Sequence, residues 1–291
     1  MASIFPPFDP DDTPRRRGVR QLRFISIRQI VPNLVTLLAL CVGLTSMRMS
    51  IELRFDAAIA AIAIAAFLDG VDGRVARFLK STSRFGAELD SLTDFLNFGV
   101  APVVLIYIWA LSELRSLGWI AALIFAICAA LRLARFNVAI EDPKRPEWQT
   151  NYFVGVPAPA GAMISLFPIY LEFVGVPHGF LTAPLVLVYT IGIGLLMISR
   201  VPTWSGKLVG RRIPREFVLP IFVLVVLYVA LLLSFSFETM AVSTLFYLGL
   251  LPVSWSGYYR RQAADTARAE SKSKDDAKDD ANGDSDDEEA T

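Results

Sequence analysis

Long apolar runs are the feature that most limits how this chain of 291 residues can fold. A helix needs roughly 20 mostly apolar residues to cross the hydrocarbon core of a membrane. Segments of about this length recur along the chain: Ile30–Met49, Ala57–Leu79, Gly86–Leu111, Leu117–Phe136, Ala158–Val174, Leu181–Ser199, Phe217–Ser236 and Thr239–Ser256. Only 19% of the residues are charged, whereas soluble domains average about 25%. The sequence therefore predicts an all-α, polytopic integral membrane protein and excludes a secreted mini-protein, a collagen and a wholly disordered chain.

Basic residues mark one side of the predicted membrane. They gather before the first span and in every second loop after it, and the intervening loops contain only Arg48, Arg54 and Arg115. Positive residues beside membrane spans normally face the cytoplasm, so we expect both termini there. The basic positions on this side include Arg15, Arg16, Arg17, Arg20, Arg23, Arg28, Lys80, Arg84, Lys144, Arg145, Lys207, Arg211, Arg212 and Arg215.

Acidic residues are concentrated in the second and third predicted spans, where charges are costly and usually functional. Asp69, Asp72 and Ala76 are spaced by three and four residues, so they share one face of a helix. Asp90 and Asp94 lie four residues apart on the next span. Two antiparallel helices would therefore present four carboxylates to one another near the cytoplasmic surface.

Four carboxylates in a confined site repel one another and require compensating cations. Mg²⁺ and Mn²⁺ prefer oxygen ligands, and a pair of such ions is a known device for phosphoryl transfer. Two other interpretations are an interfacial network of ion pairs with neighbouring arginines and lysines, and the ion pathway of a divalent-cation transporter. A network of ion pairs explains neither the glycines nor the spacing. A transporter would spread its carboxylates across the bilayer, so we favour a metal site.

The acidic motif resembles a family signature. From Asp69 to Asp94 the chain reads Asp-x-x-Asp-Gly-x-x-Ala-Arg, eight residues, then Gly-x-x-x-Asp-x-x-x-Asp. This pattern is similar, at every fixed position, to the signature of the CDP-alcohol phosphatidyltransferases. Further stretches resemble the phosphatidylserine synthase branch of that family, and together the resemblance covers roughly residues 28–210. These stretches are Pro32–Thr36, Ser83–Leu92, Arg132–Asn137 and Gly155–Gly161.

The resemblance implies a division of the chain into four parts. The family shares a core of six transmembrane helices, which would occupy residues 30–210, followed by an additional transmembrane pair at 211–258. A basic cytoplasmic segment at 1–29 would precede the core. The tail at 259–291 should be disordered, because it is polar and acidic. We further expect a homodimer in the cytoplasmic membrane of a bacterium, surrounded by membrane lipids, with its active site facing the cytoplasm and no nucleic-acid partner.

The resemblance also implies a reaction, the transfer of a phosphatidyl group from CDP-diacylglycerol to L-serine with release of CMP. Two ions, Mg²⁺ or Mn²⁺, would be bound, one by Asp69, Asp72 and Asp90 and the other by Asp69, Asp90 and Asp94. Asp94 would in addition act as the general base that takes the proton of the serine hydroxyl.

Two further groups of residues are assigned by the same resemblance or by their position. Four positions match the family's CDP-binding residues: Gly73, Ala76, Arg77 and Gly86. Asn33 and Thr36 would line the same nucleotide pocket. The candidates for binding serine, at the cytoplasmic end of the fourth span, are Arg132, Arg135 and Asn137. The alternative for these three is anchoring to lipid phosphate or a topology signal.

Two alternatives to this function stay open. The first keeps the reaction and changes the acceptor to glycerol 3-phosphate, an inositol phosphate or choline. The second is the divalent-cation transporter. His178, the single histidine, falls in a predicted outer loop, on the wrong side of the membrane for the chemistry.

Overall fold

The computed structural model describes residues 27–79, 81, 83–140, 152–199, 202–204, 215–252 and 254. The basic segment before residue 27, Lys144 and Arg145, the loop at 205–214 and the acidic tail lie outside the described residues, so the expectations for them stay predictions.

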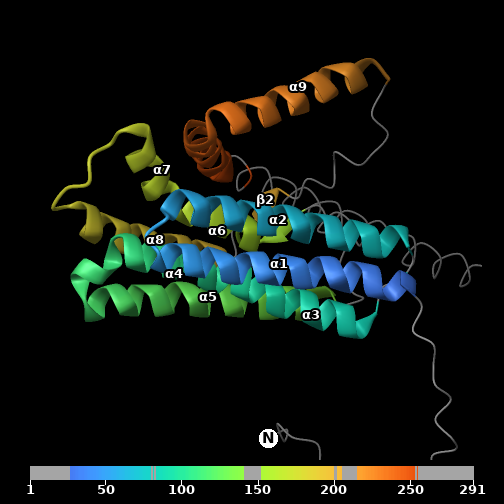
Figure 1. Ribbon diagram of the computed structural model, residues 1–291, viewed down its shortest axis with the longest axis horizontal. Helices are drawn as coiled ribbons and strands as arrows, with labels where there is room; N and C mark the ends of the chain where they lie inside the picture. The colour runs from blue at the N-terminus through green and yellow to red at the C-terminus, as the bar shows by residue number, and fades with distance from the viewer. Residues whose placement is uncertain are drawn as a thin grey trace, which may run out of the picture.

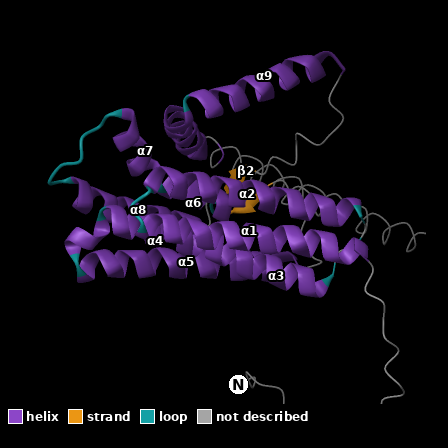
Figure 2. Cartoon of the chain, viewed as in Figure 1, coloured by secondary structure: helices purple, strands orange, loops and turns teal. Residues whose placement is uncertain are grey.

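The described residues form a bundle of helices, and the prediction of an all-helical membrane protein is confirmed (Figures 1 and 2). The α-helices are α1 (Ile27–Ile51), α2 (Phe55–Phe78), α3 (Arg84–Asp94), α4 (Ala101–Trp109), α5 (Ser116–Ile140), α6 (Ala158–Ser165), α7 (Phe167–Val174), α8 (Thr182–Ile198) and α9 (Arg215–Ser234). Residues 236–252, the C-terminal helix, are also helical. A π-helix, η1 (Phe95–Val100), joins α3 to α4, and a 3₁₀-helix, η2 (Leu111–Leu114), follows α4. A short antiparallel pair, β1 (Tyr152–Val154) with β2 (Pro202–Trp204), links two loops.

The observed helices follow the predicted spans, with two differences. The third span is one continuous segment, Arg84–Trp109, but it consists of α3, η1 and α4. The fifth is divided into α6 and α7 at Leu166, two residues before Pro168, because a proline interrupts the backbone hydrogen bonds of a helix. Within the described residues, the helices that are long and apolar enough to cross a membrane are Ile30–Ile51, Arg84–Trp109, Ser116–Val138 and Glu216–Ser234.

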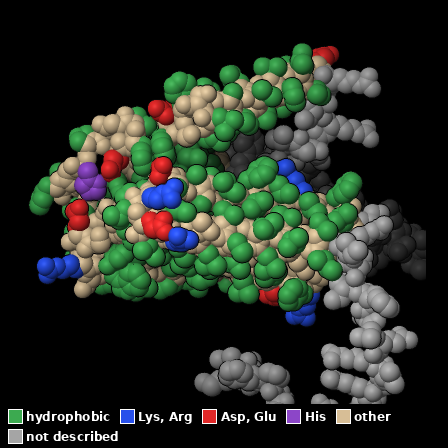
Figure 3. Space-filling model, in the orientation of Figure 1, with side chains coloured by type: hydrophobic (Ala, Val, Ile, Leu, Met, Phe, Trp, Pro, Cys, Tyr) green, Lys and Arg blue, Asp and Glu red, His purple; other side chains and the backbone are tan. Residues whose placement is uncertain are grey.

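Small side chains allow the core helices to approach closely. The buried face of α2 carries Ala58, Ala61 and Ala65, and α1 packs along most of its length against α2 (Figure 1). Close packing of small residues is the usual basis of helix association in membranes. Larger buried side chains, such as Phe98 and Phe125, fill the space between α2, α4, α5 and α8. Most of the visible outer face is hydrophobic, as a lipid-facing surface requires (Figure 3).

The C-terminal pair packs more loosely on the bundle. None of the α9 segment Glu216–Ser234 is buried, and α9 crosses the bundle at an angle (Figure 1). A cavity of about 270 Å³ separates this pair from α2 and α6. Its walls are mainly small or apolar, including Ala63, Ala66 and Ala160 from the core and Leu232 and Met240 from the pair.

His178 belongs to a cluster of polar side chains at one end of the bundle. Its partners in this cluster come from η2 and α7. Its Nε2 lies 3.5 Å from Glu113 Oε1, and its Nδ1 lies 3.2 Å from Glu172 Oε2. Trp109 Nε1 donates a hydrogen bond of 2.7 Å to Glu172 Oε2 and stacks edge-on against the imidazole. These contacts give His178 a structural role in joining the loop between α7 and α8 to α4 and η2.

Replacing His178 with alanine should lower stability without affecting the opposite end of the bundle. Partly exposed ion pairs contribute about 1 kcal/mol or less, so we expect a small decrease in the apparent Tm of the detergent-purified protein. The stabilisation that Mn²⁺ gives to the protein should not change. A weaker Mn²⁺ response in His178→Ala would contradict a purely structural role.

Candidate metal centre

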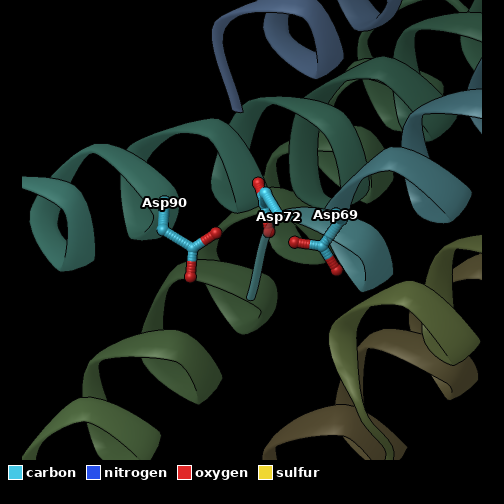
Figure 4. A group of neighbouring side chains, drawn as sticks. All are labelled: Asp69, Asp72 and Asp90. Carbon is cyan, nitrogen blue, oxygen red and sulfur yellow. The ribbon is translucent and has the colours of Figure 1, made fainter. Parts of the chain in front are cut away.

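Three of the predicted carboxylates converge between α2 and α3. The side chains of Asp69 and Asp72 come from the second half of α2, and that of Asp90 comes from α3 (Figure 4). One carboxylate oxygen from each lies within 4.8 Å of the others. Helix α3 is started by Ser83, whose Oγ accepts a 3.0 Å hydrogen bond from the Gly86 amide. The chain thus ends α2 and begins α3 so that Asp69 and Asp72 of α2 lie near Asp90 of α3.

Thr36 holds Asp72 in place from a third helix. The hydroxyl of Thr36, in α1, donates a 2.7 Å hydrogen bond to Asp72 Oδ2, and both side chains are buried. A hydrogen bond to a charged group is stronger than one between neutral groups. Thr36 is assigned to the nucleotide pocket from the sequence, and its hydroxyl contacts one of the candidate metal ligands.

Asp94 lies one helical turn further along α3 and is not part of the group of three. Its carboxyl group lies beside that of Asp69. Its Oδ1 is buried and has no hydrogen-bond partner among the described residues. Buried acceptors of this kind normally have a partner, and a cation is one group that would provide it.

This donor set fits a hard divalent cation. All the candidate ligand atoms are carboxylate oxygens, the type that Mg²⁺ and Mn²⁺ prefer. Without a cation, the convergence of these charges would be strongly unfavourable. Asp69, Asp72 and Asp90 could therefore hold a metal ion, with Asp94 adjacent to Asp69.

The residues assigned to nucleotide binding divide into two groups. Gly73 and Arg77 are exposed on α2, and a Cβ added to Gly73 would meet no atom within 4 Å, so the space beside Asp72 is open. Ala76, on the same helix, is half-buried. Gly86 instead allows close packing, because a Cβ there would lie 2.9 Å from Asn33 Oδ1 in α1.

Only one of the three candidate serine-binding residues faces the carboxylates. Arg132 is buried and interacts electrostatically with both Asp94 and Asp69. Its guanidinium stacks over Phe136, 5.3 Å from the ring centre.

The other two candidates bind neighbouring helices. Arg135 is exposed and donates a 2.7 Å hydrogen bond to the backbone oxygen of Ile198, at the end of α8. Asn137 donates a 2.9 Å hydrogen bond to Ser91 Oγ in α3. These contacts tie the end of α5 to the rest of the bundle.

One neighbour of the site has no counterpart in the sequence prediction. Tyr247, in the C-terminal helix, lies near Arg132 and packs against the core. No motif surrounds Tyr247, and an aromatic residue near the end of a span is also typical of an interfacial anchor. The sequence therefore contained no specific signal for this contact.

Comparison with known proteins agrees with this geometry. The family model of the CDP-alcohol phosphatidyltransferases matches residues 29–197. The chain belongs to this family. A second model, described as CDP-alcohol phosphatidyltransferase 2, matches residues 216–252, which lie in the C-terminal pair.

Several curated relatives carry the name CDP-diacylglycerol–serine O-phosphatidyltransferase. One from Mycobacterium leprae is 48% identical over 177 residues, which cover 60% of this chain and 58% of the relative. One from Mycobacterium tuberculosis is 43% identical over 190 residues, 64% of this chain and 63% of the relative. One from Helicobacter pylori is 31% identical over 231 residues, 78% of this chain and 91% of the relative. The chain thus spans less than two thirds of the length of the mycobacterial relatives.

Removing one carboxylate should weaken cation binding selectively. A ligand present at 100 times its Kd stabilises a protein by about 2.7 kcal/mol, so Mn²⁺ should raise the apparent Tm of the detergent-purified protein. Asp90→Asn should reduce this response strongly. Glu88→Gln is the matched control, because Glu88 lies on the exposed face of the same helix. Equal responses in both variants would mean that Asp90 is not a ligand.

Proposed function

We propose that the chain transfers the phosphatidyl group of CDP-diacylglycerol to L-serine, forming phosphatidylserine and CMP. The observation that carries the proposal is the meeting of Asp69, Asp72 and Asp90 at the family's signature motif. The names of the curated relatives favour serine as the acceptor. In this proposal residues 30–210 form the catalytic core and residues 211–258 an additional pair of membrane helices.

We assign two divalent cations, Mg²⁺ or Mn²⁺, to the carboxylates. Asp69, Asp72 and Asp90 would hold one ion, and Asp69, Asp90 and Asp94 the other. When bound, such ions neutralise the charge of a pyrophosphate and stabilise the charge that develops on phosphorus and on the leaving group. The unpartnered Oδ1 of Asp94 supports its inclusion in the second set.

The chain's own residues would position the substrates and move one proton. The hydroxyl oxygen of serine attacks the β-phosphorus of CDP-diacylglycerol and forms a new P–O bond. The bond between that phosphorus and the CMP oxygen breaks, and CMP leaves with the electron pair. Asp94 takes the proton of the attacking hydroxyl. The open space beside Gly73 would receive the CDP moiety, with Ala76 and Arg77 on the same helix. The family resemblance assigns Asn33, Thr36 and Gly86 to the same pocket.

Arg132 is the residue that we assign to the carboxylate of serine. It is buried next to Asp94 and Asp69, and among the described residues no carboxylate oxygen lies within 4.0 Å of it, so its guanidinium would still have donors for the carboxylate of serine. Serine needs fewer basic partners than a phosphorylated acceptor would. Within the part of the chain that the structure describes, few basic residues lie near the carboxylates, which favours serine over glycerol 3-phosphate or an inositol phosphate.

The family resemblance and the charge distribution support a proposal for the cellular setting. From the resemblance we place the protein in the cytoplasmic membrane of a bacterium. We place the carboxylates on the cytoplasmic side, because basic residues accumulate in the loops that lie on the same side of the predicted membrane. A homodimer remains our expectation from the family.

The reaction can be tested directly with purified protein, CDP-diacylglycerol and Mn²⁺. Release of CMP should require L-serine and should not be stimulated by glycerol 3-phosphate, inositol phosphate or choline. Asp94→Asn should reduce the rate by at least about 100-fold, the lower range for loss of a general base, and Glu88→Gln should retain it. If another acceptor stimulated the release of CMP, the reaction class would stand and serine would be rejected as the acceptor. Failure with every acceptor, in protein that still binds Mn²⁺, would favour a transporter.

The assignment of Arg132 predicts a change in one kinetic constant. Arg132→Gln should raise the KM for serine by about tenfold or more, since a hydrogen bond to a charged group contributes about 1.5–3 kcal/mol. The KM for CDP-diacylglycerol should change much less. Arg135→Gln, which removes a neighbouring arginine bound to the α8 backbone, should have the smaller effect on serine. The reverse order would move the serine site to Arg135.

A further inference from the structure

The π-helix η1 begins immediately after Asp94, the last residue of α3. Its wider turn is shown by the hydrogen bond from the Ala101 amide to the carbonyl of Leu96, five residues earlier. Pro102 follows and has no amide hydrogen to continue the α-helical pattern. A π turn holds one residue more than an α turn, which corresponds to about 100° of rotation. Whether η1 forms therefore decides how Asp90 and Asp94 point relative to α4.

Asn97 connects η1 to α1. Its side chain is fully buried, and Nδ2 donates a 3.2 Å hydrogen bond to the backbone oxygen of Ala39. One turn later in α1, Gly43 leaves the space that Asn97 occupies, because a Cβ at Gly43 would overlap Asn97 Oδ1. The approach of α1 to η1 at this point thus requires a glycine at position 43, and the Asn97 amide bridges the two helices through one hydrogen bond.

The π-helix η1 also packs closely against α5. A Cβ at Gly99 would lie 3.1 Å from the Cβ of Ala129. The π-helix is therefore enclosed between α1 and α5. The same two helices carry Thr36, which binds Asp72, and Arg132, which faces Asp94.

We infer that Asn97, seated against Gly43, is a positioning residue that locks the π turn and so directs Asp90 and Asp94 toward Asp69 and Asp72. Because α1 binds Asp72 through Thr36 and η1 through Asn97, one helix sets the positions of carboxylates from both α2 and α3. The inference needs one part of the proposed function, namely that these carboxylates bind a divalent cation.

Ser46 offers a matched control for a residue that is merely structural. It is also fully buried in α1, and its Oγ donates a 2.9 Å hydrogen bond to the backbone oxygen of Ala58 in α2. Ala58 lies about three helical turns before Asp69. Loss of either side-chain hydrogen bond should lower the stability of the bundle, but only the loss at Asn97 should disturb the carboxylates.

The experiment compares Asn97→Leu, Ser46→Ala and the wild type as full-length protein in detergent, with the apparent Tm followed as Mn²⁺ is added. Both variants should melt at lower temperature than the wild type without Mn²⁺. Asn97→Leu should raise the half-saturating Mn²⁺ concentration by about 10-fold or more, the usual effect of losing a residue that orients metal ligands. Ser46→Ala should leave it within about twofold, well below that range.

A second pair of variants covers the case in which Asn97→Leu does not fold. Gly43→Ala keeps the amide of Asn97 but adds a methyl group against it, and it should also raise the half-saturating Mn²⁺ concentration. Gly192→Ala is its control, since a Cβ at Gly192 in α8 would meet nothing within 4 Å.

The possible results separate the inference from the proposed function. The inference would be overturned if Asn97→Leu and Ser46→Ala had the same half-saturating Mn²⁺ concentration. If Asn97→Leu does not fold, equal half-saturating concentrations in Gly43→Ala and Gly192→Ala would overturn it. The absence of any Mn²⁺ response in the wild type would overturn it as well. An Asn97-dependent Mn²⁺ response without release of CMP in the presence of serine would uphold the inference and reject the proposed function.

Discussion

Mutual repulsion of carboxylates inside a membrane protein is the constraint on which the rest of this structure depends. Like charges repel strongly at short range, and a low-dielectric surrounding increases the repulsion. Asp69, Asp72 and Asp90 nevertheless meet within 4.8 Å. The helices that carry them must therefore be held together by contacts elsewhere. Those contacts come from close backbone packing, at the alanine face of α2 and at Gly43 and Gly86.

Helix α1 organises the site although it supplies no carboxylate. One face of this helix carries small and polar residues spaced by three or four, and each contacts a neighbouring helix or lies buried against one. They are Asn33, Thr36, Ala39, Gly43, Ser46 and Ser50. Small residues at this spacing allow membrane helices to pack closely, and hydroxyls and amides then bond across the interface. Successive turns of α1 accordingly contact the start of α3, then Asp72, then η1, and finally the start of α2.

Helical periodicity explains which parts of the site could be predicted from sequence. Asp69 and Asp72, like Asp90 and Asp94, are close along the chain, so their common face follows from residue spacing alone. The directions of Arg135 and Asn137 do not follow from spacing, because their hydrogen bonds reach α8 and α3, which are distant in sequence. The π turn was also missed. Apart from Pro102, its segment Phe95–Val100 looks like any other apolar stretch of a span.

Arg132, a residue of the core, has a neighbour in the C-terminal pair of helices. A buried guanidinium is costly in hydrocarbon unless polar groups surround it. Asp94 and Asp69 face Arg132 from one side, and Tyr247 of the C-terminal helix provides an additional polar neighbour. Tyr247 belongs to the segment that the second family model matches. The C-terminal helix therefore reaches the surroundings of Arg132 through Tyr247, whereas none of the α9 segment Glu216–Ser234 is buried.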